Sequence, residues 1–104
     1  MQKSLFIPLK TEYFEAFESG KKTVELRALN DRWNLKVCRI GRSVLLSKGY
    51  GKHHRLKGYV GHAEIVRGCE LELNEREAVK ECYGNDALNI VRIRIDGLQP
   101  VETA

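Results

Sequence analysis

The sequence predicts an α+β protein, mainly β, in which a small antiparallel β-barrel is flanked by two or three helices. Its length of 104 residues suits a single domain, which we expect to span residues 1–104. Most apolar residues recur with a period of two, as in half-buried strands, and only two segments have helical spacing. Short connections and glycines inside the longest predicted strand favour a barrel, because the strands of a barrel must bend to close it.

The first elements are expected to be a strand and a helix. Residues 4–9 (SLFIPL) form a short apolar run, which Pro8 confines to an edge or to a strand end. A helix is predicted over residues 11–19, with Thr11 as its N-cap. Gly20 fits the left-handed position that ends a helix.

Residues 22–29 alternate between polar and apolar side chains and predict the next strand. Val24 and Leu26 are expected to face the core. The opposite, wetter face of this strand would then carry the polar side chains Thr23, Glu25 and Arg27.

The rest of the chain predicts turns and strands with one late helix. Residues 30–39, which include the single tryptophan, form a loop or a short helix, and Gly41 begins a turn. Gly58 and Gly61 are expected to bend a long strand. The elements predicted here are a strand at 43–47, a loop at 48–55, a strand at 56–66, a helix at 74–82 capped by Asn74 and ended near Gly84, and a strand at 89–98.

Composition argues against several classes of protein. No apolar run approaches the roughly 18 residues that a membrane-spanning helix needs. The N-terminal segment lacks the long apolar region of a secretory signal, so we expect a cytoplasmic protein without a membrane partner. The three cysteines are far apart, which argues against a disulfide framework and a zinc site. We therefore predict no metal and no cofactor.

Charge is distributed unevenly along the chain, although the net value is only +4. Residues 32–60 contain eight lysines and arginines and no acidic residue, whereas residues 69–88 contain six acidic residues and two basic ones. A basic segment on a molecule of mixed charge favours a polyanionic partner that is met on one side. An interaction adaptor that uses the same asymmetry to bind a protein remains an alternative.

The strand at 22–27 is the first candidate site. A lysine beside a carboxylate can take part in acid–base chemistry if it is buried, which makes Lys22 and Glu25 the candidate catalytic pair. Arg27 shares a face with Glu25 and could orient that carboxylate or bind a phosphate in bidentate fashion. Thr23 lies on the same face. The alternative is an edge strand with ordinary surface ion pairs.

The loop at 48–55 is the second candidate, because it combines glycines, cations and an aromatic ring. Its cations can neutralise phosphates, and Tyr50 can stack on a base. A third candidate pairs Arg32 with Trp33, whose ring belongs either to the core or to the wall of a pocket. The predicted nucleic-acid-binding side chains of this loop are Lys48, Tyr50, Lys52 and Arg55.

The run PLKTEYFEAFESGKKTVELR, followed by DRW, GRSVLLSKGYGK and HRLKGYVGHAEI, resembles the ASCH (activating signal cointegrator homology) family. The residues that carry the resemblance most strongly are a glycine that ends a helix and the alternating polar residues after it. These residues are Gly20, Lys22, Thr23, Glu25 and Arg27. The resemblance covers roughly residues 5–66 and implies a PUA-like barrel.

This resemblance implies RNA binding or RNA-linked regulation, and two kinds of activity are known in the family. Some small members are amidohydrolases that act on N4-acetylcytidine, and one branch has been described as a ribonuclease. In the amidohydrolases a lysine, a threonine three residues later and a downstream glutamate form the site. Lys22 matches the lysine, but Glu25 stands where the threonine would be. The downstream glutamate would be one of Glu70, Glu72, Glu75 and Glu77.

The preferred hypothesis is therefore an ASCH-type module that binds RNA or a nucleotide. Its basic cleft would be formed by the strand at 22–27, Trp33 and the loop at 48–55. A small hydrolase of a modified nucleoside or of RNA is the alternative. The sequence leaves open whether the protein is an enzyme, as well as its oligomeric state.

Overall fold

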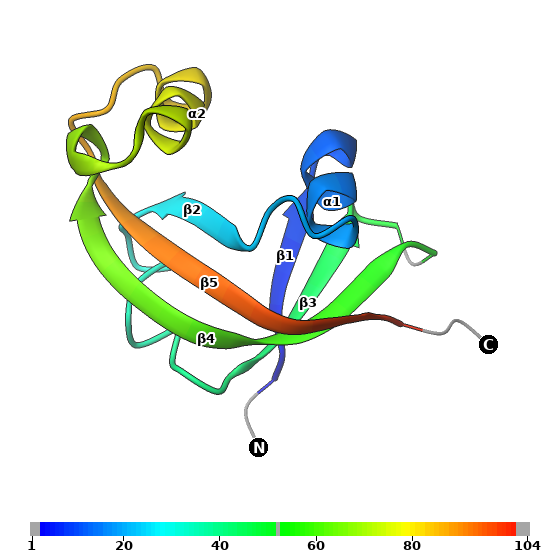
Figure 1. Ribbon diagram of the computed structural model, residues 1–104. Coiled ribbons are helices and arrows are strands. Elements are labelled where there is room, and N and C mark those ends of the chain that lie inside the picture. Colours follow the sequence, from blue (N-terminus) through cyan, green and yellow to red (C-terminus); the bar gives the residue numbers. More distant parts are fainter. Residues whose placement is uncertain (1–2, 52, 102–104) are drawn as a thin grey trace.

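The computed structural model describes residues 3–51 and 53–101 of the chain. Figure 1 shows a strongly curved sheet with two α-helices on one side of it. In chain order the elements are β1 (Leu5–Leu9), α1 (Thr11–Glu18), β2 (Val24–Ala28), β3 (Ser43–Lys48), β4 (Arg55–Arg67), the 3-10 turn η1 (Gly68–Glu70), α2 (Leu73–Tyr83) and β5 (Asn89–Pro100).

The five strands form one sheet in the order β1-β3-β4-β5-β2, which makes an open half-barrel. The predicted class, α+β and mainly β with flanking helices, is confirmed. The prediction of a wholly antiparallel sheet is wrong at one pair, because β1 runs parallel to β3. A parallel pair needs a long connection, and α1, β2 and the following loop provide it. β1 and β2 are left as the two edges of the sheet.

The longest strand, β4, bends where the sequence places two glycines. Its pairing with β5 shifts register between Lys57 and Tyr59 and again between Val60 and His62. A Cβ atom on Gly58 would lie 2.7 Å from the carbonyl oxygen of Asp96, so a side chain does not fit there. The predicted bend is confirmed, and it gives the sheet its curvature.

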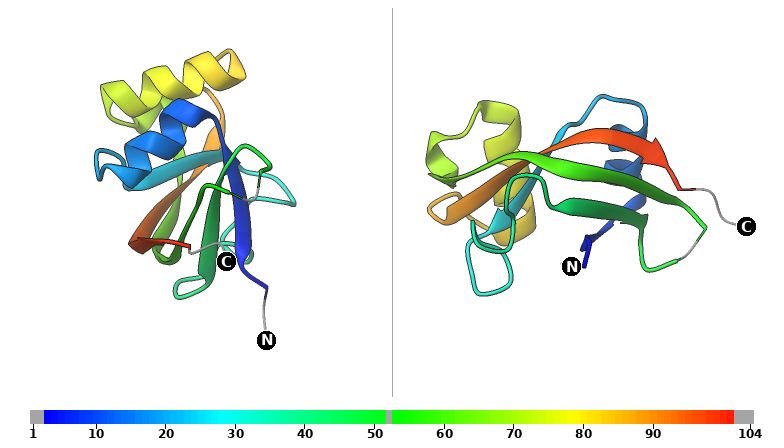
Figure 2. Two further views of the ribbon diagram at one scale, coloured as in Figure 1. Left: turned by 90° about the vertical axis from the view of Figure 1, so that its right-hand side faces the viewer. Right: turned by 90° about the horizontal axis from the view of Figure 1, so that it is seen from below.

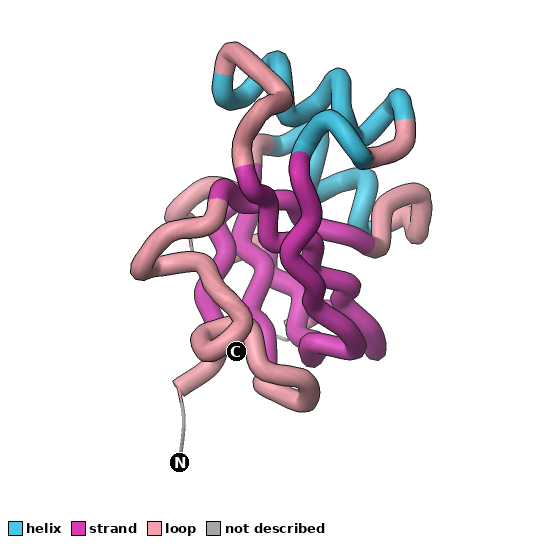
Figure 3. Tube along the Cα trace, turned by 90° about the vertical axis from the view of Figure 1, so that its left-hand side faces the viewer, coloured by secondary structure: helices cyan, strands magenta, loops and turns pink. Residues whose placement is uncertain are grey.

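Helix α1 closes one side of the core. Phe14 and Phe17 are buried in the cluster that β1, β3, β4 and β5 also supply. The predicted N-cap is wrong, because the helix already begins at Thr11 and Lys10 caps it without a side-chain hydrogen bond. The predicted helix end is confirmed by Gly20, which has a φ of 82°. Figure 3 shows both helices gathered at one end of the molecule, with the strands beneath them.

Helix α2 begins one residue earlier than predicted. It starts at Leu73, and its N-cap is Glu72 rather than Asn74. Gly84 ends it in the left-handed conformation, as the sequence predicts. Asp86 lies just beyond that end and pairs with Arg76 of the helix. The guanidinium of Arg76 lowers the pKa of the Asp86 carboxyl group. The ion pair ties the helix to the segment that leads into β5.

The prediction of which face of β2 is buried is wrong: the face that carries Glu25 points toward the core. Glu25 pairs with Ile93, whose side chain is fully buried, so that Glu25 points toward the core and is itself buried. Val24 and Leu26 instead pair with the outward-facing Arg94 and Arg92, and they are only half-buried. Alternation along an edge strand defines two faces, but it does not say which of them is inside.

Candidate functional site

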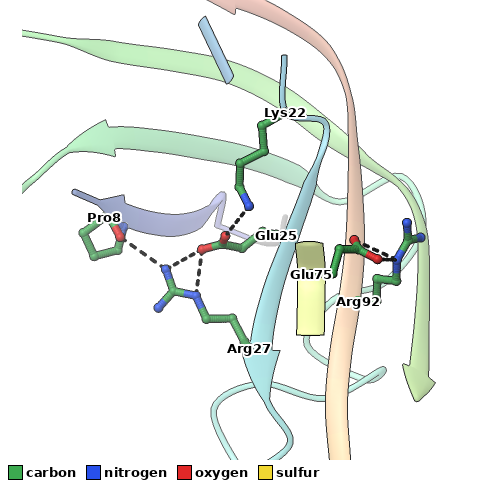
Figure 4. Close-up of polar contacts among 6 residues, drawn as sticks. All are labelled: Pro8, Lys22, Glu25, Arg27, Glu75 and Arg92. Atoms are coloured by element: carbon green, nitrogen blue, oxygen red, sulfur yellow. Dashed lines mark hydrogen bonds and ion pairs between the residues drawn. The ribbon is translucent and has the colours of Figure 1, made fainter. Parts of the chain in front are cut away.

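The candidate site lies at the open seam of the half-barrel, where the edge strands β1 and β2 face each other. Figure 4 shows Arg27 reaching toward Pro8 across this seam, with Glu25 beside it and the side chain of Lys22 pointing toward Glu25. The guanidinium of Arg27 donates a hydrogen bond of 3.2 Å to the carbonyl oxygen of Pro8. That carbonyl lies on the unpaired edge of β1. Arg27 therefore joins two strands that share no backbone hydrogen bonds in the sheet.

Glu25 lies at the centre of the seam, and both of its carboxylate oxygens have partners. Oε2 accepts a hydrogen bond of 2.9 Å from Nε of Arg27, and Nη2 of the same residue lies 2.8 Å away. Oε1 lies 3.8 Å from Nζ of Lys22. One carboxylate thus lies between two cations, which leaves this trio with a formal charge of +1.

Lys22 is held in place by the turn that ends α1. Its backbone N–H donates to the carbonyl oxygen of Ala16 at 3.0 Å, immediately after the left-handed Gly20. The ammonium group lies 5.5 Å from the ring centroid of Tyr13 and 5.4 Å from that of Phe17. Two aromatic faces and one carboxylate therefore fix the position of this charge.

Arg27 rests on the tryptophan. Its guanidinium carbon lies 4.7 Å from the centroid of Trp33, whose ring is buried in the core. The side-chain oxygen of Asn30 positions Trp33 by accepting hydrogen bonds from the backbone N–H groups of Arg32 and Trp33. Of the two alternatives for Trp33, the core role is the one that the structure shows. The buried ring of Trp33 packs against the guanidinium of Arg27 and so holds that side chain in the site.

A cleft of about 230 Å³ opens above this trio, between the seam and the two helices. Lys22, Glu25 and Arg27 form its polar floor. Its walls are mainly apolar and aromatic. They include Pro8, Tyr13, Leu26, Val79 and Tyr83.

Helix α2 supplies the outer wall of the cleft, which the sequence did not predict. Ala78, Val79, Cys82 and Tyr83 line it, and the hydroxyl of Tyr83 accepts a hydrogen bond of 3.2 Å from the backbone N–H of Ala28. In the sequence this helix falls within the acidic stretch at 69–88, and no binding role was predicted for it. The usable signal was the apolar position of Val79 within it, which is now seen to be buried.

Tyr13 faces Cys82 across the cleft, from α1. Burial, assisted by Cys82 and nearby glutamates, raises the pKa of the Tyr13 phenol. The ring therefore presents a neutral hydroxyl at the cleft wall, able both to donate and to accept a hydrogen bond.

A second cleft, of about 430 Å³, lies on the other side of Lys22. Thr23 lines this second cleft and is exposed, so it does not share a pocket with Glu25 and Arg27. The remaining wall comes from the end of α1, from Leu56 of β4 and from the far end of β5. Among the predicted site residues that the structure describes, Lys22 alone borders both clefts.

The loop at 48–55 does not join this site. None of its described residues lines either of the two clefts that border the strand at 22–27. Tyr50 and Arg55 instead contact Phe6 on β1. Lys52 lies outside the described residues. Arg32 is exposed, and it too lines neither cleft.

The four candidate downstream glutamates do not join Glu25 in the cleft. None of them lines the cleft. Glu75 accepts hydrogen bonds of 3.2 Å from Arg92 of β5, as Figure 4 shows. Arg92 lies opposite Leu26 in the register, and it therefore points away from the face that carries Glu25. Over residues 3–51 and 53–101, no group of three or more His, Cys, Asp or Glu side chains could hold a metal ion.

The thiol of Cys38 lies outside the candidate site. Cys38 is buried, and burial raises the pKa of its thiol, which disfavours the reactive thiolate.

In the described part of the chain, no helix has the length and apolar character needed to cross a bilayer.

The open half-barrel with two helices on one side is a small α+β domain, mainly β. Figure 2 shows from two further directions that α1 and α2 remain on the same side of the sheet. No protein-family model matches the chain, and no curated protein does either. The solved structures identify the fold more closely.

Within that class, the fold is that of the ASCH domain. The crystal structure of ASCH from Zymomonas mobilis matches with a TM-score of 0.65 at 16% identity, over 93% of this chain and 69% of that one. Two point mutants of the same protein give TM-scores of 0.62 and 0.58, at 16% and 17% identity. They cover 97% and 93% of this chain and 74% and 70% of theirs. The resemblance to ASCH proteins is thus confirmed at the level of the fold.

Proposed function

We propose that the protein is an ASCH-type module that binds RNA or a nucleotide, with one nucleobase in the cleft above Glu25. The observation that carries this proposal is the fixed trio of Lys22, Glu25 and Arg27 on the floor of a cleft whose walls are mainly apolar and aromatic. Apolar walls with a few convergent polar groups are typical of sites for small organic ligands.

The chemistry of the cleft suits a base. A carboxylate accepts hydrogen bonds from the amino or imino N–H groups of a base edge, and an ammonium group donates to its ring nitrogens and carbonyl oxygens. The rings of Tyr13 and Tyr83 and the side chain of Leu26 can pack against the faces of a base.

Size and charge narrow the ligand further. The volume of about 230 Å³ is below the roughly 300–1,000 Å³ of pockets that enclose drug-sized ligands. We therefore expect a single base inside and its sugar and phosphate at the mouth. Lys10, Lys22 and Arg27 line the cleft against the one carboxylate of Glu25, which favours an anionic ligand.

The test is titration with the four ribonucleoside monophosphates and a short single-stranded RNA at fixed salt. Lys22→Ala removes a charged donor, so we expect roughly 10- to 100-fold weaker binding of the preferred nucleotide. Lys21→Ala is the matched control, because Lys21 is the exposed neighbour of the same charge and is outside both clefts. Equal losses in the two variants, or none in Lys22→Ala, would contradict the proposal.

A hydrolase that acts on an acylated nucleoside or on RNA is the second candidate. The distance of 3.8 Å between Nζ of Lys22 and Oε1 of Glu25 favours it, since such a pair can exchange protons with a bound substrate. Turnover of N4-acetylcytidine or of single-stranded RNA, abolished in Glu25→Gln, would support it. A protein that binds these substrates and leaves them intact would be a binding module alone.

A further inference from the structure

The loop between β3 and β4 belongs to a surface on the far side of β1 from the core. Leu5, Ile7 and Leu9 are buried, so Phe6 between them points away from the core. The register places Phe6 beside Leu45 of β3, and Leu45 beside Lys57 of β4. We call this surface the outer face. It consists of Phe6, Leu45, Tyr50, Arg55, Lys57 and Tyr59.

Aromatic rings and a cation are already stacked on the outer face. The ring of Tyr50 lies 6.3 Å from that of Phe6, with 39° between their planes, and the guanidinium carbon of Arg55 lies 5.4 Å from the centroid of Phe6. The carbonyl oxygen of Gly51 holds this arrangement by accepting hydrogen bonds from Ser47 and Arg55. Tyr50 is nevertheless 82% exposed. Its ring has a free face for a ligand.

The charge of the outer face is positive. Within residues 3–51 and 53–101, neither Arg55 nor Lys57 has a carboxylate within 4.0 Å. Asp96 lies beside Tyr59 in the register, and Arg94 pairs with it at 3.1 Å. Proteins that bind single-stranded nucleic acids combine exposed aromatic rings with cations, because the bases stack on the rings and the phosphates pair with the cations.

We propose that the outer face binds single-stranded RNA on one side of the nucleotide that occupies the cleft. This inference rests on the proposed function of the cleft. The two sites are connected through β1, because Pro8 lines the cleft and lies two residues after Phe6 on the same side of the strand. Two residues of a strand span about 7 Å, so the strand of RNA has a short and direct path between them.

The proposal requires unpaired bases. In a duplex the faces of the bases are covered by their neighbours, whereas Tyr50 and Phe6 need a free face on which to stack. A duplex would reach the outer face only through its phosphates. We therefore expect a clear preference for the single strand at equal length.

The experiment compares three probes at fixed salt: the preferred mononucleotide, a single-stranded RNA of about eight nucleotides that contains it, and a duplex of the same length. Tyr50→Ala should weaken binding of the single strand roughly 5- to 100-fold and leave the mononucleotide unaffected. Lys57→Ala should reduce the slope of log K against log salt by about 0.7. Leu73→Ala and Arg67→Ala are the controls, because both residues are exposed and lie away from the outer face.

The outcomes separate the two proposals. If the mononucleotide binds and Tyr50→Ala leaves the single strand as tight as before, the outer face is not a binding surface and the cleft proposal stands. If the mononucleotide fails to bind but the single strand binds in a Tyr50-dependent way, the cleft proposal fails. In that case the outer face still binds RNA, but not as the extension of an occupied cleft. Equal affinity for duplex and single strand would overturn the stacking mechanism.

Discussion

The seam and the outer face contain the same pair of groups, an arginine on an aromatic ring, in opposite surroundings. Arg27 lies on the buried Trp33 and pairs with a buried carboxylate, whereas Arg55 lies on the half-buried Phe6 beside an exposed tyrosine. In the seam, the partners of each charge are part of the folded structure. On the outer face they are left for a ligand to supply. The difference lies in burial, which residue types alone do not reveal.

The largest expected contrast is between the two aromatic residues. Trp33→Ala would leave a cavity in the core and remove the support of Arg27, so we expect it to lower the free energy of unfolding by about 3–5 kcal/mol. Tyr50→Ala should change it by less than about 0.5 kcal/mol, because that ring is exposed. Urea denaturation measures both. Similar values for the two would show that the seam is not the more strongly packed region.

The carboxylate of the seam comes next. Glu25→Gln leaves Lys22 and Arg27 without their shared anion, and we expect a loss of about 3 kcal/mol. This is at the low end for a buried ion pair, since the two cations are 24% and 22% exposed. Glu77→Gln on the exposed side of α2 is the control, with an expected change below about 0.5 kcal/mol. A Glu25→Gln protein as stable as this control would mean that the trio does not stabilise the fold.

A smaller effect is expected when an arginine is replaced by lysine at each place. Arg27→Lys keeps the charge but loses the flat stack on Trp33 and the hydrogen bond to Pro8, for an expected loss of about 1–2 kcal/mol. Arg55→Lys on the outer face should lose about 0.5 kcal/mol. Both are measured by urea denaturation of otherwise identical proteins. The comparison fails if Arg55→Lys is the more damaging change.

The smallest effect concerns the wall of the cleft. The pKa of Asp86 is lowered by Arg76, so the contribution of this pair to stability is present above the ordinary carboxyl pKa and disappears as the pH falls through the lowered value. Asp86→Asn should therefore reduce stability at neutral pH and bring it close to the parent protein in acid. Denaturation midpoints from pH 7 down to about pH 2 test this. A difference that stays constant with pH would exclude the ion pair as its cause.

Local signals in the sequence were sufficient for most elements of the fold. Gly20 and Gly84 end the two helices, and the glycines of β4 mark its bend, because each of these features depends on backbone conformation at one place. The helix N-caps were predicted wrongly at Thr11 and Asn74. In both helices the residue before the first turn caps it without a side-chain bond, so the polar side chain carried no information there.

The site was harder to predict, because it depends on contacts between distant segments. The trio at 22–27 was found, but its face was assigned incorrectly, since only the pairing of Glu25 with Ile93 reveals which side of β2 is inside. The wall from α2 and the position of the loop at 48–55 likewise follow from tertiary packing. Within the loop, Arg55 and Tyr50 do lie together, because both contact Phe6, but they lie against β1 rather than beside the strand at 22–27.

The pairing of β2 with β5 also has a consequence for the order of folding. β2 is made early in the chain, but the strand beside it is the last one, with residue 25 opposite residue 93. β3, β4 and β5 can pair with near neighbours, whereas β2 has no strand to join until β5 has left the ribosome. Until then Glu25 has no interior to enter and can stay hydrated. The site is thus assembled at the end of folding, and a chain that carries a complete cleft has already completed its sheet.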